Sequence, residues 1–361
     1  MKKLRNILAA LAVAIPLGMG TGGCHHIDEW DNDLYGNFDA LWTIIDEHYC
    51  FFSHKEWVDW ENIRLQYRSQ IKEGMTYKVL FALCADMLEE LRDGHTNLIS
   101  WFDVSYYRQW WSDYPQNYEE RLVQQYYLTF DHHTGGGIEY KLLEDSNVGY
   151  MRYASFAATP GHSFIDNMML ELKDCDGLII DVRNNSGGEI TNVERIASHF
   201  IRDKFTAGYI THKTGPGHDD FSEPYPITYA PADQHVRWFK PVIVLTNRST
   251  FSAANTFVSV MKALPQVAVA GDVTGGGCGM PFSSELPSGW AVRFSASPVY
   301  DSEMQLTEFG IAPTAGAEVA LDPVAALSGT DTMIDFAVEA IKACKEQKVL
   351  PKQYFETHGK E

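Results

Sequence analysis

The stretch VIVLTNRSTFSAANTF, residues 242–257, joins a run of apolar residues to a helical pattern through a short turn. Such a run, bounded by a turn, is typical of a strand buried inside a sheet. Ser252 falls in the first turn of the expected helix, where free backbone N–H groups and the helix dipole favour negative charge. Its hydroxyl is therefore well placed to become an alkoxide or acyl group, while Ser249 and Thr250 fit the ordinary role of helix caps.

A second apolar strand carries a pair of glycines just beyond its end. The stretch GLIIDVRNNSGGE, residues 177–189, places Gly187 and Gly188 between this strand and the next helix. Glycines there allow the backbone to turn its N–H groups toward a bound oxygen, as an oxyanion hole requires. On spacing alone, an ordinary strand-to-helix turn with a glycine for close packing is the simpler interpretation.

Strands and helices alternate around these two stretches, over residues 146–346. The expected strands are 148–153, 177–182, 242–245 and 267–271, and the expected helices include 162–172, 251–264 and 333–344. This alternation predicts an α/β domain built from βα units. The alternating stretch 290–297 follows a Pro-Ser-Gly turn and is expected to form one arm of a hairpin.

The chain on either side of this domain has a different character. Apolar residues recur at intervals of three and four between Phe38 and Leu91 and predict a small helical domain over residues 34–100. Residues 101–145 are rich in aromatic side chains, and we expect them to bridge the two domains or to line a substrate groove. Residues 347–361 are expected to form a C-terminal tail.

The first residues have the pattern of an export signal. Basic residues are followed by a short apolar stretch and by small residues that lead to Cys24. We expect residues 1–23 to be a signal peptide, because the apolar stretch is too short to span a bilayer. Small residues before a cysteine resemble the lipobox of bacterial lipoproteins, which would make Cys24 a lipidated first residue and residues 24–33 a linker. Plain secretion with Cys24 as a free thiol is the alternative.

Composition limits the partners. The 361 residues include 48 acidic and 29 basic ones, which gives a net charge of -19, and no basic run is present. Nucleic-acid binding needs a clustered basic surface, so a nucleic-acid partner is excluded. No pair of cysteines has metal-binding spacing, and the sequence implies neither a metal nor another cofactor.

A nucleophilic serine needs a base, and the base needs a group that orients it. The candidate base is His95 in RDGHTNL, just past the end of an expected helix. The candidate acid is Glu308 in LTEFGIAPT, on an expected loop.

Together, these segments resemble the tail-specific, or C-terminal processing, serine proteases, in particular the branch similar to the tricorn protease core. The resemblance runs in order through NFDALWTIIDEHYCFF, DGHT, YMRYASF, GLIIDVRNNSGGE, FSAANTF and EFGIAPT. It implies a crotonase/ClpP-like ββα-type catalytic domain preceded by a small helical domain. About fifty residues separate DGHT from YMRYASF, too few for the PDZ module that many relatives insert.

The resemblance also implies a mechanism. Ser252 would be the nucleophile, His95 the general base and Glu308 the acid that holds His95. The backbone amide of Gly187 or Gly188 would bind the oxyanion together with the backbone amide of Ala253. An exported, lipid-anchored serine endopeptidase that acts on peptides or unfolded protein through an acyl-enzyme is implied, with no cofactor and with the lipid anchor as its only membrane contact. Its rate should rise with pH through the ordinary titration of histidine.

Three positions depart from the family pattern. Gly277 stands where many relatives have the lysine of a Ser/Lys dyad, so only the histidine route remains. Asn255 replaces a frequent glutamate, and Gly94 replaces a serine of the tricorn branch. These departures keep open a weak or inactive relative that binds peptide or another ligand in the same cleft. An esterase with the same triad is a third reading, although the GxSxG motif of the usual α/β-hydrolases is missing.

Overall fold

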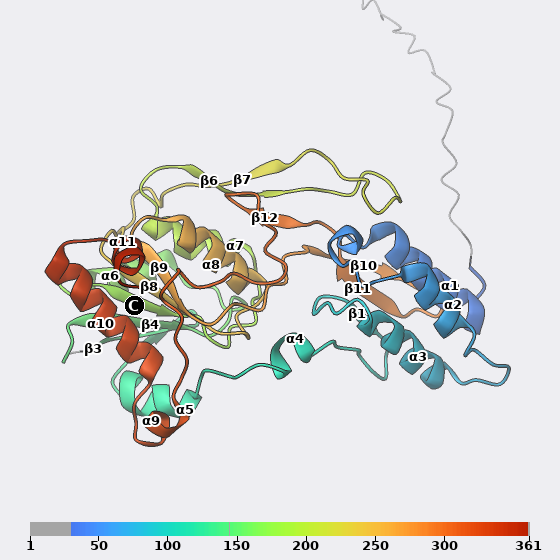
Figure 1. Ribbon diagram of the computed structural model, residues 1–361, viewed down its shortest axis with the longest axis horizontal. Helices are drawn as coiled ribbons and strands as arrows, with labels where there is room; N and C mark the ends of the chain where they lie inside the picture. The colour runs from blue at the N-terminus through green and yellow to red at the C-terminus, as the bar shows by residue number, and fades with distance from the viewer. Residues whose placement is uncertain (1–29, 144, 360–361) are drawn as a thin grey trace, which may run out of the picture.

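The computed structural model describes residues 30–143 and 145–359. They form two bodies, a larger α/β domain and a smaller domain with helices α1 to α3, joined by extended segments (Figure 1). The expected signal peptide, the lipidation at Cys24 and most of the expected linker 24–33 lie outside the described residues. No helix within the described ranges is both long enough and apolar enough to cross a bilayer.

The larger domain is organised around a six-stranded sheet in the order β2-β3-β4-β5-β8-β9. Its strands are β2 (His133–Gly135), β3 (Ile138–Leu143), β4 (Val148–Tyr153), β5 (Leu178–Asp181), β8 (Val242–Thr246) and β9 (Val267–Gly271). Neighbouring strands from β4 to β9 run parallel, and β3 pairs antiparallel with β4. Every residue of β4, β5, β8 and β9 is buried, as the apolar runs of β5 and β8 predict for those two strands.

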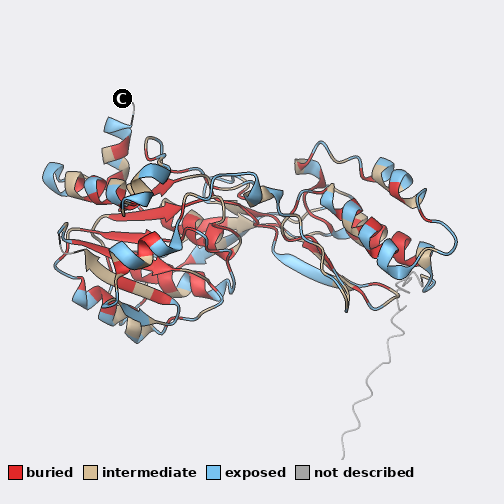
Figure 2. Cartoon of the chain, turned by 90° about the horizontal axis from the view of Figure 1, so that it is seen from below, coloured by how far each residue is buried: buried red, intermediate tan, exposed pale blue. Residues whose placement is uncertain are grey.

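Helices cover both faces of this sheet, which is why its strands are buried (Figure 2). One face packs against α6 (His162–Glu171), α7 (Thr191–Ala197) and α8 (Ala253–Ala263). The other face packs against α10 (Thr332–Gln347) and α11 (Pro351–His358). The expected tail 347–361 thus contains a helix, and Phe355 anchors it because its ring is buried in the core.

The remaining elements of the larger domain are short. Next to α8 lies a three-stranded sheet in the order β12-β6-β7, made of β6 (Phe205–Ile210), β7 (Tyr225–Tyr229) and β12 (Val299–Asp301). The helical segments are α5 (Glu120–Leu122), η2 (Val123–Leu128), η3 (Ser198–Phe200) and α9 (Pro323–Leu327). Strands β6 and β7 fall in a glycine- and proline-rich stretch for which the sequence indicated no regular element.

The smaller domain contains the helices that the apolar stripes predict. They are α1 (Leu34–His48), α2 (Trp60–Arg68) and α3 (Tyr77–Glu89), with the short η1 (Phe52–His54) between α1 and α2. A three-stranded sheet covers them, made of β1 (Asn97–Ile99), β11 (Ala291–Ser295) and β10 (Pro281–Glu285). The expected hairpin therefore exists but does not belong to the α/β domain, where its position in the chain had placed it. Trp290 and Phe294 are buried in the core of the smaller domain instead, so the boundary 146–346 encloses a segment of the other body.

The aromatic segment 101–145 does not form a separate domain. Its first part crosses between the two bodies and contains the short helix α4 (Gln109–Ser112), as Figure 1 shows. Its last part supplies β2 and β3 to the large sheet. A bridging role was one of its two expected roles.

Candidate active site

Ser252 lies in the loop that follows β8, directly before the first residue of α8. Its backbone has φ 58° and ψ -123°, a conformation that non-glycine residues rarely adopt and that occurs mainly at functional sites. The Ser252 amide donates a hydrogen bond of 2.8 Å to the Gly276 carbonyl, which helps to hold this turn. Although Ser252 is the N-cap residue of α8, its side chain makes no capping hydrogen bond. The hydroxyl is therefore free to point elsewhere.

His95 comes from the other body, in the turn between α3 and β1. Its Nε2 lies 3.0 Å from the Ser252 Oγ, although 157 residues separate the two in the chain. This is hydrogen-bond distance for a serine and its general base. The structure thus brings together two side chains that the sequence places on different domains.

The surroundings of His95 keep its imidazole neutral. Burial lowers the pKa of His95 to about 4, the nearby Asp93 charge opposes this shift, and Arg293 adds to it. The imidazole can therefore accept a proton from Ser252 at neutral pH. The expected titration of the rate consequently moves below the ordinary range of histidine. Among the described residues, no group hydrogen-bonds to the buried Nδ1 of His95.

Glu308 lies near this pair but does not touch the imidazole. Its Oε2 accepts a hydrogen bond of 2.8 Å from the Cys278 amide, and its side chain is buried. Burial raises the pKa of Glu308 to about 8, the Asp93 charge adds to the shift, and Lys55 opposes it. The carboxyl is therefore largely protonated at neutral pH, and no hydrogen bond to His95 Nδ1 holds the imidazole.

Two charged residues beside the site were not singled out from the sequence. Lys55 Nζ lies 3.9 Å from Asp93 Oδ2 and 3.9 Å from Glu308 Oε1, and it donates a 2.9 Å hydrogen bond to the Leu91 carbonyl. Asp93 Oδ1 accepts a 2.7 Å hydrogen bond from the His95 amide. The aspartate of DGHT was available as a signal. Lys55 lies just after η1, in a connection whose sequence says nothing about its distant neighbours.

The glycine pair lies beside Ser252. A Cβ on Gly187 would stand 2.8 Å from Ser252 Cβ and 2.9 Å from the Ala253 nitrogen, so only glycine fits there. The Gly187 amide already donates to Asn185 Oδ1, at 2.9 Å. In the described part of the chain, the amides of Gly188 and Ala253 donate to no protein group. Of the two glycines, Gly188 therefore has the N–H that remains available for an oxyanion.

Asn255 has a structural role at the position of the frequent glutamate. Its Nδ2 donates to Cys278 Sγ at 2.8 Å and to the Thr307 carbonyl at 3.2 Å. These bonds tie α8 to Thr307, which precedes Glu308, and to Cys278, which follows the glycine stretch. Asn255 is fully buried and has no contact with Ser252 Oγ or His95 among these bonds.

The arrangement has the parts that acyl transfer requires. A hydroxyl lies against a neutral imidazole, and free amides lie next to the hydroxyl. The described ranges contain no group of three or more metal-binding side chains.

Two protein-family models match the chain. The model of peptidase family S41 matches residues 147–316, and that of the tricorn protease C1 domain matches residues 31–89. The first region contains the glycine pair and Ser252, and the second contains α1 to α3.

Known proteins of similar sequence or fold point to the same family. The carboxy-terminal processing protease CtpB of Bacillus subtilis (strain 168) is 29% identical over 137 residues, which cover 38% of this chain and 26% of the relative. The chain thus spans about a quarter of that curated relative. The solved structure of mature CPAF complexed with lactacystin has a TM-score of 0.67 at 11% identity, covers 90% of this chain and 99% of its own, and shows the shared fold.

A more similar structure covers nearly the whole chain. It is that of a protein from Parabacteroides merdae ATCC 43184, provisionally described as a peptidase, with 47% identity and a TM-score of 0.83. The match covers 88% of this chain and 99% of that one. The chain therefore belongs to peptidase family S41, the tail-specific protease family that its motifs indicated.

Proposed function

We propose that the protein is a serine endopeptidase that hydrolyses peptides or unfolded proteins through an acyl-enzyme. The observation that carries the proposal is the 3.0 Å distance between Ser252 Oγ and His95 Nε2. Ser252 attacks the scissile carbonyl while His95 takes its proton, and His95 then returns a proton to the leaving amine. Water hydrolyses the acyl-enzyme by the same route.

The amides of Gly188 and Ala253 are the proposed oxyanion donors. Both are free of other hydrogen bonds in the described chain, and the close approach of Gly187 to Ser252 brings the glycine pair next to the nucleophile. Two such donors stabilise the charge that develops on the carbonyl oxygen in the transition state.

Glu308 is the proposed acid of the triad. The support is indirect: Glu308 is buried in the same charged cluster, and His95 Nδ1 is a buried polar atom that needs a partner. The role requires Glu308 in its ionised form, with the carboxylate turned from the Cys278 amide toward Nδ1–H. Asp93, which already bonds the His95 backbone, is the competing acid.

We also propose that the protein is exported and attached to a bacterial membrane through a lipid on Cys24. The support is the basic and apolar start of the sequence and the small residues before the cysteine. Growth with a labelled fatty acid tests this. The wild type should carry the label and fractionate with membranes, whereas Cys24→Ala should do neither. An unlabelled, soluble wild type would favour plain secretion.

The catalytic proposal is tested with a fluorophosphonate, which bonds to Oγ of an activated serine with loss of fluoride. The wild type should be labelled at Ser252 and should cleave a denatured protein. Ser252→Ala and His95→Ala should abolish both activities, while Ser249→Ala, in the same loop, should keep them. A folded wild type that neither labels nor cleaves would instead support a relative that only binds peptide in this cleft.

A further inference from the structure

We propose that Asn247 is a positioning residue that holds the glycine-pair loop (184–188) against the nucleophile loop (247–252). It thereby sets the place of the oxyanion amides relative to Ser252 Oγ. The inference rests on the proposed function, because it concerns the geometry of that reaction.

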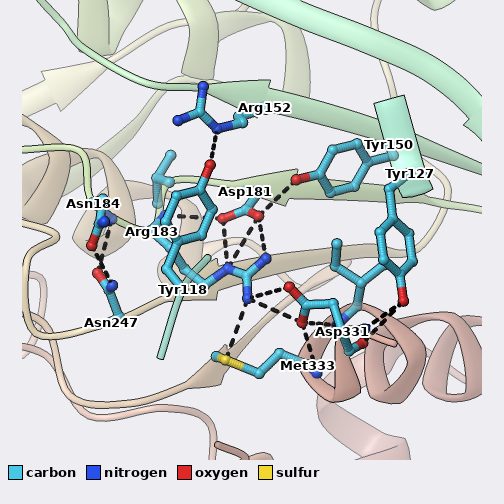
Figure 3. Close-up of polar contacts among 12 residues, drawn as sticks. Tyr118, Tyr127, Tyr150, Arg152, Asp181, Arg183, Asn184, Asn247, Asp331 and Met333 are labelled. Atoms are coloured by element: carbon cyan, nitrogen blue, oxygen red, sulfur yellow. Dashed lines mark hydrogen bonds and ion pairs between the residues drawn. The ribbon is translucent and has the colours of Figure 1, made fainter. Parts of the chain in front are cut away.

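The side chain of Asn247 uses its full hydrogen-bonding capacity. Its Oδ1 accepts from the amides of Asn184 at 2.9 Å and Ser249 at 3.2 Å. Its Nδ2 donates to Asn184 Oδ1 at 2.7 Å and to the Gln116 carbonyl at 2.6 Å. An amide offers two donors and two acceptor sites, so one fully buried side chain joins three segments. Figure 3 shows the reciprocal pair between Asn184 and Asn247.

Asn184 is the first residue of the glycine-pair loop, shortly after the end of β5 at Asp181. Its φ is 56°, in the left-handed region that asparagine tolerates better than most residues. The following residue, Asn185, accepts from the Phe251 amide at 3.0 Å and from the Gly187 amide at 2.9 Å. Hydrogen bonds to the adjacent residues Asn184 and Asn185 therefore link Asn247 to Gly187 through one peptide bond.

The residue directly before the glycine-pair loop is also held in place. Arg183 is fully buried, and its guanidinium bonds to Asp181 at 2.6 Å and to Asp331 at 3.0 Å. Figure 3 shows this cluster, in which Tyr150 also donates to Asp181. Because residue 183 is held by the sheet and by α10, the freedom that remains in the loop begins at Asn184, where Asn247 binds.

The test replaces Asn247 by alanine and compares it with a matched variant in the other domain. Asn37 is equally buried, donates to the Asp33 carbonyl at 2.7 Å and accepts from the Ser288 amide at 2.8 Å. Asn37→Ala removes a similar amide far from the loops of the site. Fluorophosphonate labelling gives two readings: its amplitude counts folded sites, and its rate reports the geometry of each site.

Asn247→Ala should lower the labelling rate per site and kcat by about ten- to a hundredfold, because misplaced oxyanion donors act in the transition state. KM should change little. Asn37→Ala should change the amplitude and the Tm but leave the rate within about twofold of the wild type. Equal rates per site in all three proteins would overturn the proposal while leaving the peptidase assignment intact. A wild type without labelling or cleavage would remove the assignment itself.

A second pair of variants serves if Asn247→Ala does not fold. Asn184 is exposed, so its replacement should be tolerated. Asn184→Gly keeps the backbone conformation but loses the oxygen that Asn247 Nδ2 binds, and its rate should fall severalfold. Asn184→Asp keeps an acceptor oxygen there and should stay near the wild-type rate. Equal rates in these two variants would also overturn the proposal.

Discussion

The ring of Phe251 occupies the space that a side chain at Gly277 would need. A Cβ on Gly277 would stand 2.3 Å from two ring carbons of Phe251. The ring is held from two sides, since its centroid lies 4.1 Å from that of Trp110 and 4.7 Å from that of His95. A Cβ on Gly94 would lie 2.7 Å from Trp110 Nε1. Two departures from the family pattern therefore follow from one aromatic cluster.

Restoring the lysine should not restore a Ser/Lys dyad. Gly277→Lys meets the Phe251 ring and also forces a side chain onto a backbone with φ +78°. We expect a loss of about 1–3 kcal/mol in the free energy of unfolding and a lower rate of peptide cleavage. Urea denaturation and steady-state assays measure both.

Gly289→Lys is the matched control for the backbone effect. Gly289 has φ +79°, but the nearest atom to its Cβ lies 3.9 Å away. The Gly289→Lys protein should lose stability only because its backbone at residue 289 is strained, and it should keep its activity. A Gly277→Lys protein as stable as this control, or faster than the wild type, would contradict the packing argument.

Local patterns predicted the elements better than their assembly. The strands 148–153 and 267–271 were predicted to the residue, because a short run of strand-forming residues between turns depends only on nearby sequence. The hairpin of β10 and β11 was predicted as an element but not in its domain. Its partner strand β1 lies almost two hundred residues away, and no local signal reveals such a pairing.

The same division applies to the site. Ser252 and the glycine pair were recognisable, because a strand followed by a special turn is a local pattern. Lys55 was not, because its position beside Asp93 and Glu308 results from packing between the two bodies. The depressed pKa of His95 also follows from burial, which no motif records.

The pH dependence of cleavage should show this burial. With the pKa of His95 near 4, neutral imidazole persists at all higher pH values, so the histidine contributes no rise in kcat/KM between about pH 5.5 and 7.5. A rise toward pH 8 would instead report the ionisation of Glu308, whose pKa is about 8. The value of kcat/KM should fall below about pH 5 as the imidazole takes up a proton. Measurements of kcat/KM between about pH 3.5 and 8, within the range in which the protein stays folded, check this.

The Phe251→Ala variant tests the cause of that shift. Removing the ring admits water to one face of His95, so the midpoint should move up toward 6.5, the ordinary value for histidine. A wild-type midpoint already near 6.5 would show that the imidazole is not desolvated in the working enzyme.

Isosteric amides distinguish the two candidate acids. Glu308→Gln cannot supply the carboxylate that would stabilise the His95 imidazolium, so near pH 8, where Glu308 is about half ionised, kcat/KM should fall at least about a hundredfold. Asp93→Asn keeps an oxygen that accepts from the His95 amide, so the kcat/KM of this variant should fall only about tenfold. Steady-state assays at one pH, with active sites counted by labelling, give the comparison. A larger loss of kcat/KM for Asp93→Asn than for Glu308→Gln would assign the role of the triad acid to Asp93.

Lys55→Met should destabilise the protein in a way that depends on pH. Lys55 is the ammonium that lies 3.9 Å from both Asp93 and Glu308. Its removal raises the pKa of Glu308 further above the ordinary value and removes the charge that holds the pKa of Asp93 below its ordinary value. A carboxyl with a raised folded pKa favours folding at low pH and loses that contribution as pH rises. The Asp93 part of the loss is already present near pH 5, whereas the Glu308 part grows as pH rises, so the loss should be clearly larger near pH 8.5 and reach about 3–5 kcal/mol there.

Urea denaturation at these two pH values measures the effect, and two further variants identify its origin. Lys78→Met removes an exposed lysine from α3 and should show no such pH dependence. Adding Glu308→Gln to Lys55→Met removes one of the stranded carboxyls and should recover part of the loss near pH 8.5, because one fewer buried charge then lacks a partner. A loss for Lys55→Met that is equal at both pH values would mean that Lys55 contributes packing and its hydrogen bond to Leu91 rather than charge.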